Sequence, residues 1–133
     1  MNAAGSPLPA ISLHDGEYSI CRLRRIPDAD AIQGIFFIAR TSEEISLVCR
    51  SSCVPDDAEE VSPGWALLQV EGPLDFSMVG VISRISSALS DAGVSLFATS
   101  TFLTDYFLMR TPDVRKASAS LASEGYEVRG SLE

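Results

Sequence analysis

The hydrophobic pattern is clearest in the second half of the chain. From Met78 to Ala92, apolar residues recur in steps of three and four, which predicts an amphipathic helix. Asp75 or Ser77 can cap the start of this helix, and Gly93 stands where a left-handed residue would end it. This helix is therefore the element that the hydrophobic pattern predicts most clearly.

Short apolar runs and a second helix surround it. The pattern predicts strands over residues 65–70, 94–101, 106–110 and 126–129, and a helix from Pro112 to about Ser123. The order is β-α-β-β-α-β, the ferredoxin-like arrangement of the α+β class. The right-handed crossover rule then places both helices on one face of a four-stranded antiparallel sheet.

The first half of the chain contains a shortened copy of this pattern. Residues 34–50 align without a gap with residues 94–110, sixty positions later, and both blocks are strand, turn, strand. The stretches that would have to hold helices, 24–33 and 51–63, are too short for them. We therefore expect a degenerate unit over residues 1–63 and a complete unit over residues 64–133.

Composition restricts the classes of function. The 133 residues carry a formal net charge of −8, which disfavours nucleic acid or an anionic membrane surface as the main partner. No apolar run approaches the length of a membrane span, and the first residues do not resemble a secretory signal. We expect a cytoplasmic protein with no membrane partner.

Candidate catalytic and metal-binding residues are few. His14 is the single histidine, and Cys49 and Cys53 have a spacing that is not typical of zinc ribbons or redox pairs. Cys21 and Cys49 are better interpreted as small buried hydrophobic residues within strands. We therefore expect no enzymatic activity, no metal and no cofactor.

The stretch from Val79 to Met109 resembles the ACT-domain proteins. The resemblance rests on the helix, the Asp-Ala-Gly-Val-Ser turn after it, and the segment Ser-Thr-Phe-Leu-Thr-Asp-Tyr. More narrowly, the chain resembles small tandem-ACT proteins related to the regulatory domains of aspartate kinase and to the arginine-binding cytosolic sensors of animals. The resemblance implies that such domains pair side by side and bind small ligands, usually amino acids, where two domains meet.

Carried onto this chain, the resemblance implies a ligand pocket made of a loop and an opposing turn. The eight candidate ligand-binding residues are Phe76, Ser77, Met78 and Val79 in the loop, and Ser100, Thr101, Phe102 and Asp105 opposite. Free N–H groups at the start of a helix favour a carboxylate. The Asp105 carboxylate can accept a hydrogen bond from an ammonium group. The simpler alternatives are that Ser77 only caps the helix and that Asp105 only stabilises a turn.

Two functions follow from these expectations. The first is a non-catalytic regulatory protein, a homodimer that binds an amino acid between ACT units. The alternative is an oligomerisation or interaction module with no small-molecule ligand, because the ferredoxin-like fold hosts many functions.

Overall fold

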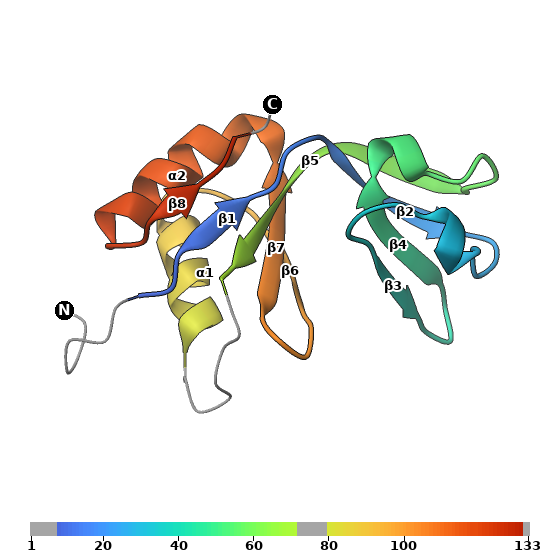
Figure 1. Cartoon of the computed structure of the whole chain (residues 1–133), viewed down its shortest axis with the longest axis horizontal. Coiled ribbons are helices and arrows are strands. Elements are labelled where there is room, and N and C mark those ends of the chain that lie inside the picture. The colour runs from blue at the N-terminus through green and yellow to red at the C-terminus, as the bar shows by residue number, and fades with distance from the viewer. Residues whose placement is uncertain (1–7, 72–79, 132–133) are drawn as a thin grey trace. The chain divides into compact units, whose positions relative to one another are not determined.

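The computed structural model describes residues 8–71 and 80–131, and its contacts divide the chain into two units (Figure 1). The small unit is Gly16–Trp65. The large unit is Ala66–Glu133 together with the stretch that precedes Gly16. Strand β5, Glu60–Val70, contributes to both units because the division falls within it.

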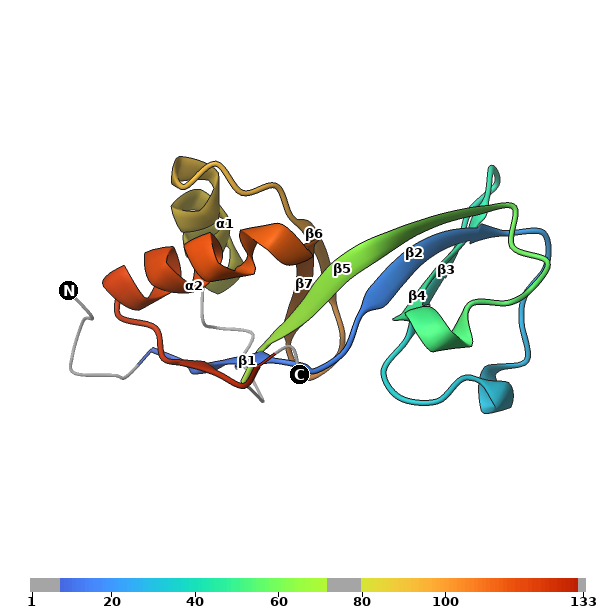
Figure 2. The same cartoon turned by 90° about the horizontal axis from the view of Figure 1, so that it is seen from above.

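The large unit is a sheet covered by two helices on the same face (Figure 2). Its sheet order is β6-β7-β5-β1-β8. The elements are β1 (Ile11–Leu13), the end of β5, α1 (Val81–Asp91), β6 (Phe97–Ser100), β7 (Asp105–Arg110), the 3-10 turn η4 (Thr111–Asp113), α2 (Val114–Ser123) and β8 (Val128–Arg129). From β5 onward the order is β-α-β-β-α-β, so the predicted ferredoxin-like fold is confirmed.

Strand β1 corrects the predicted sheet. Ile11 pairs with Val70 of β5 in an antiparallel ladder and with Val128 of β8 in a parallel one. Within the described residues, the large unit's part of the sheet therefore has five strands, and β1 and β8 are parallel, whereas four antiparallel strands were predicted. A strand of three residues is too short to give a periodic signal, so this stretch was expected in the first unit and instead packs in the large one.

The small unit has the same strand order without the helices. Its sheet order is β3-β4-β2-β5, and the first three of these strands correspond to β6, β7 and β5 of the large unit. The elements are β2 (Tyr18–Leu23), the 3-10 turn η2 (Ala29–Ala31), β3 (Phe37–Arg40), β4 (Ile45–Arg50), the 3-10 turn η3 (Ser51–Cys53) and the start of β5. The prediction that residues 24–33 hold no long helix is confirmed.

The two hairpins repeat each other residue by residue. Phe37 pairs with Val48 in one hairpin, and Phe97 pairs with Leu108 in the other. Strands β3 and β4 and turn η3 begin sixty residues before β6, β7 and η4. The gap-free repeat read from the sequence is therefore a repeat of hydrogen-bonded register.

The boundary expected near residues 62–64 is a bulge inside β5. Tyr18 pairs with Trp65, but Ile20 pairs with Ser62, so Pro63 and Gly64 together face a single residue of β2. Proline is tolerated at a bulge because the ladder does not need its missing N–H there. The Pro-Gly pair at the expected unit boundary thus lies in an irregular part of one strand, and β5 runs without interruption from Glu60 to Val70.

Helix α1 begins later than predicted and ends where predicted. Its N-cap is Gly80, whereas the pattern placed the start at Met78, and the candidate caps Asp75 and Ser77 lie outside the described residues. At the other end Gly93 adopts φ 78°, and the N–H of Val94 donates to Leu89 O at 2.8 Å. This is the left-handed termination expected from glycine.

Each unit has its own hydrophobic core. In the large unit α1 and α2 bury Ile85 and Leu121 against the sheet, and the Ser120 hydroxyl donates to Ala88 O at 3.1 Å, which ties the two helices together. In the small unit the core is built around Cys21, Leu23, Leu47 and Cys49. The interpretation of Cys21 and Cys49 as buried small hydrophobic residues is confirmed.

Candidate functional site

Ser100 and Asp105, two of the predicted site residues, lie directly opposite each other where the β6–β7 hairpin turns. The Ser100 hydroxyl donates to Asp105 Oδ1 at 2.5 Å. Asp105 begins β7, so its carboxylate lies at the turn end of this strand. Ser100 and Asp105 are five positions apart in the sequence, and the hairpin register brings the hydroxyl and the carboxylate into contact.

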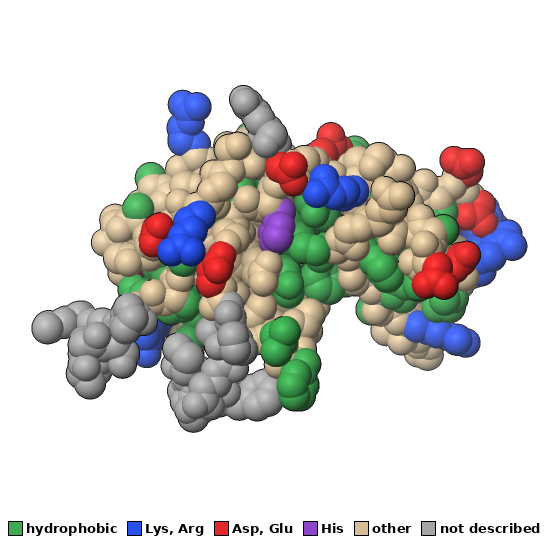
Figure 3. All heavy atoms as spheres, in the orientation of Figure 1, with side chains coloured by type: hydrophobic (Ala, Val, Ile, Leu, Met, Phe, Trp, Pro, Cys, Tyr) green, Lys and Arg blue, Asp and Glu red, His purple; other side chains and the backbone are tan. Residues whose placement is uncertain are grey.

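Thr101 and Phe102 occupy the turn between these two residues. The N–H of Thr101 donates to Thr104 O at 2.9 Å, and its hydroxyl reaches the same oxygen at 3.2 Å. Thr101 therefore closes the turn. Phe102 and Leu103 at the tip are 82% and 59% exposed, and Figure 3 shows hydrophobic side chains gathered at the end of this hairpin.

Thr104 is a residue of this turn that the sequence interpretation did not select. Its side chain is buried, and its hydroxyl donates to Val70 O at 2.5 Å. Val70 is the last residue of β5, and the loop predicted to bind a carboxylate comes shortly after it. The four predicted residues of that loop, Phe76, Ser77, Met78 and Val79, lie outside the described residues.

The sixty-residue repeat gives this turn a counterpart in the small unit. Arg40, Thr41 and Ile45 stand where the large unit has Ser100, Thr101 and Asp105. The N–H of Thr41 donates to Glu44 O at 2.9 Å, the same bond at the same length as in the other turn. The carboxylate of the large unit is thus replaced by an aliphatic side chain, and its hydroxyl by a guanidinium group.

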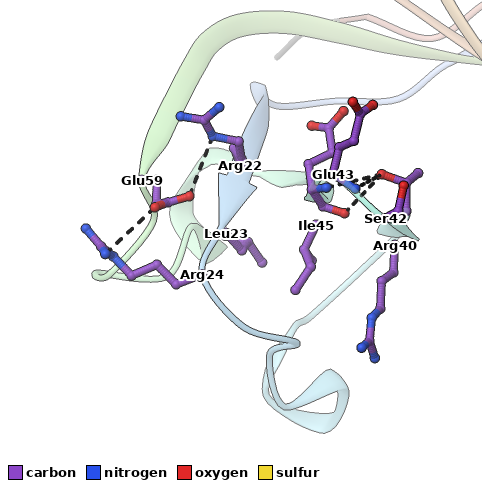
Figure 4. A pocket seen from close by; sticks show the side chains of 10 residues that line it. Arg22, Leu23, Arg24, Arg40, Ser42, Glu43, Ile45 and Glu59 are labelled. Carbon is purple, nitrogen blue, oxygen red and sulfur yellow. Dashed lines mark hydrogen bonds and ion pairs between the residues drawn. The ribbon is translucent and has the colours of Figure 1, made fainter.

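This counterpart lines a hollow of about 440 Å³ whose walls are charged (Figure 4). Arg22 and Arg24 both point to the Glu59 carboxylate, at 3.6 and 3.7 Å, whereas Arg40 extends away from them (Figure 4). The arginine side chains are about half exposed or more, so these ion pairs contribute little to stability. The two turns share geometry and differ in chemistry.

His14 and the three cysteines are the residues that the sequence offered for catalysis or metal binding. His14 Nε2 lies 2.9 Å from Gln69 Oε1, and Cys21, Cys49 and Cys53 are free thiols. Burial raises the pKa of Cys49 to about 12, and the neighbouring Cys21 and Cys53 thiols add to that rise. Within residues 8–71 and 80–131, no three His, Cys, Asp or Glu residues are arranged to hold a metal ion.

Comparison with known proteins gives both a family and a fold. A family model described as ACT domain matches residues 60–123. A protein from Agrobacterium tumefaciens with a known crystal structure is 32% identical to this chain. The match covers 96% of this chain and 98% of that one, with a TM-score of 0.83.

More distant structures share the fold. A Vibrio cholerae protein of unknown function, described as a possible transport protein, is 16% identical over 86% of this chain and 88% of its own, with a TM-score of 0.68. The regulatory subunit of aspartate kinase from Thermus thermophilus is 12% identical over 92% of this chain and 99% of its own, with a TM-score of 0.65. A search of curated proteins gave no match. Neither helix in the described part of the chain has the length and apolar character needed to cross a membrane.

Proposed function

Because the chain belongs to the ACT-domain proteins, we propose that it is a non-catalytic regulatory protein that binds an amino acid where ACT units meet. The proposal places the ammonium group of the ligand at Asp105 and its carboxylate at the N–H groups of residues 76–79. It also holds that two copies of the chain associate. The regulatory subunits of aspartate kinase that share this fold support a role in regulation.

The observation that carries this proposal is the anchored turn at the end of the sheet. Ser100 orients the Asp105 carboxylate, and Thr104 holds the same turn against the last residue of β5. A carboxylate fixed in this way loses little freedom when it accepts a charge-assisted hydrogen bond from a ligand. A turn that served only to reverse the chain would not need a buried hydroxyl bonded to a strand thirty-four residues away.

Association of two copies is supported by the free edge of the sheet. Strand β6 is the outer strand of the large unit's sheet in the described residues, and Phe97 on it is 39% exposed. Exposed sheet edges are usually covered or paired. Light scattering on the full chain is expected to give twice the 14.2 kDa of one copy, and a mass of one copy at all concentrations would contradict the dimer.

The experiment that tests the site is a thermal-shift screen of the twenty amino acids, followed by calorimetric titration of variants with the amino acid that shifts the melting temperature most. Asp105→Asn removes the charge but keeps an acceptor for Ser100, so the turn is retained. It is expected to weaken binding about tenfold to a hundredfold.

The matched control is Asp91→Asn, which removes the same charge from an exposed position at the end of α1. It is expected to leave the affinity unchanged. Equal affinities for the two variants would move the ligand away from Asp105. A screen in which no amino acid raises the melting temperature would favour the alternative, an interaction module without a small-molecule ligand.

A further inference from the structure

The small unit contains a cavity of about 310 Å³ on a part of its sheet that no helix covers. In the large unit the corresponding connections are helices α1 and α2, which pack against each other and on the sheet. In the small unit these connections contain only the 3-10 turns η2 and η3. The cavity lies between the two shortened connections and above Leu23 at the end of β2.

The lining of the cavity is mainly apolar. Seven of its ten residues have little or no polar side-chain surface: Leu23, Ile26, Pro27, Ala31, Ile32, Cys53 and Pro55. Ile26 is 47% exposed, which is high for a large aliphatic side chain beside a core. A volume near 300 Å³ with a few polar groups in an apolar wall is typical of a pocket for a small molecule.

Among the charged residues that line the cavity, Asp28 has one carboxylate oxygen without a hydrogen-bond partner in the described part of the chain. Arg25 Nε and Asp57 Oδ2 form an ion pair at 3.1 Å, so their charges offset each other. Asp28 Oδ1 accepts from the N–H of Asp30 at 3.1 Å and caps η2. Its other oxygen has no partner among residues 8–71 and 80–131. The cavity therefore carries an excess of one negative charge, in a chain whose net charge is −8.

We propose that this cavity is a second ligand site, which binds a small apolar molecule carrying one ammonium group. The hydrocarbon part lies against Ile26 and Ile32, and the ammonium group donates to the free oxygen of Asp28. The charge of the chain attracts a cation and repels an anion of the same size. This site is in the small unit and does not depend on the amino-acid site proposed at Asp105.

The first test compares three probes of the same shape by calorimetric titration of the full chain: 2-phenylethylamine, 2-phenylethanol and 3-phenylpropionate. The amine is expected to bind about tenfold more tightly than the alcohol, and the carboxylate least tightly. Equal binding of amine and alcohol, or preferred binding of the carboxylate, would overturn the proposal.

The second test uses a matched pair of variants. Asp28→Asn removes the charge and keeps a good capping acceptor for η2, so the local fold is retained. It is expected to weaken amine binding about tenfold, whereas Asp30→Asn, which changes a neighbouring residue outside the cavity lining, is expected to leave it unchanged. If both variants bind equally, the ammonium group does not meet Asp28 and the proposal fails.

Cys53 provides an independent measure of occupancy because it lines the cavity and is partly exposed, while Cys21 and Cys49 are buried. Saturating 2-phenylethylamine is expected to slow alkylation of Cys53 by iodoacetamide about fivefold or more. The same protection is expected in Asp105→Asn, which separates this site from the other one. An unchanged alkylation rate at saturation would place the amine elsewhere and overturn the proposal.

Discussion

The hydroxyl of Thr104 donates to the backbone carbonyl of Val70, and this bond fastens the β6–β7 turn to the end of β5. The two residues belong to different strands and are thirty-four positions apart in the sequence. A buried hydroxyl in a turn is uncommon, because turn residues usually satisfy their polar groups with water or with their own backbone. The bond therefore holds the turn that carries the predicted site residues Ser100 and Asp105 against β5.

Replacing Thr104 by Val removes this donor while keeping the shape of the side chain. Because a buried acceptor then loses its partner, the free energy of unfolding is expected to fall by about 1–2 kcal/mol. Urea denaturation followed by circular dichroism measures this loss. Thr101→Val, which removes a hydroxyl that forms part-buried hydrogen bonds with Thr104 within the same turn, is the comparison variant and is expected to lower the free energy of unfolding by less than Thr104→Val does. Equal losses would show that Thr104 acts only as a turn residue.

Replacing Ile11 by Ala tests the strand that sequence patterns did not reveal. Ile11 is fully buried and belongs to the core of the large unit. Truncating a buried isoleucine is expected to cost about 2–5 kcal/mol. Ser12→Ala, on the opposite face of the same short strand, is expected to cost far less. A small effect of Ile11→Ala would mean that β1 does not contribute to the core in solution.

The hairpins and the helix of the large unit could be predicted because their residues follow strong local rules. Phe97 and Phe107 lie in apolar runs of strand-forming residues, and Gly93 ends a helix of clear periodicity. Strand β1 gave no such signal, since it has three residues and pairs with segments far away in the sequence. Pro63 and Gly64 indicate a boundary between units in the sequence and form a bulge in the structure, because proline and glycine mark both features.

The candidate site was predictable only where the strand register defines it. Ser100 and Asp105 face each other because they flank a four-residue turn, and a hairpin prediction already implies this. Thr104 could not be selected, because the sequence does not show that its hydroxyl points to β5. The cavity beside Asp28 could not be predicted either. It forms because the connections around it are too short to hold helices, and no sequence motif marks it.

The three thiols are expected to react at very different rates. Cys21 and Cys49 are buried, and burial raises the pKa of both thiols, so neither forms the reactive thiolate at pH 8. Iodoacetamide is expected to modify Cys53 alone in the folded protein and all three cysteines in denaturant. Mass spectrometry of the alkylated chain counts the adducts, and Cys53→Ser is expected to leave the folded protein unmodified. Rapid labelling of Cys49 would contradict its burial.

Stability is expected to fall at alkaline pH because of Cys49. Below about pH 8 the Cys49 thiol is protonated in both the folded and the unfolded state. Its titration therefore does not change the free energy of unfolding in that range. Above that pH the unfolded chain loses this proton, whereas the folded chain keeps it up to a pKa of about 12. The unfolded state then binds fewer protons, and the free energy of unfolding decreases by up to about 1.4 kcal/mol per pH unit.

The measurement is urea denaturation of the reduced protein at several pH values. Between about pH 8.5 and 10.5, the wild-type chain is expected to lose about 2 kcal/mol more than Cys49→Ala, which has no thiol to ionise. The comparison uses the change with pH in each protein, so a constant loss from the smaller side chain cancels. Parallel curves for the two proteins would contradict the prediction.

The parallel pairing of Ile11 with Val128 also determines an order of events during synthesis. The small unit is one continuous stretch, Gly16–Trp65, so all its strands, including the start of β5, are synthesised before the helices of the large unit. The large unit needs both β1, which precedes the small unit in the chain, and β8, which follows α2. Strand β1 therefore stays unpaired on one edge until β8 has been synthesised, and we expect the large unit to fold after the small one.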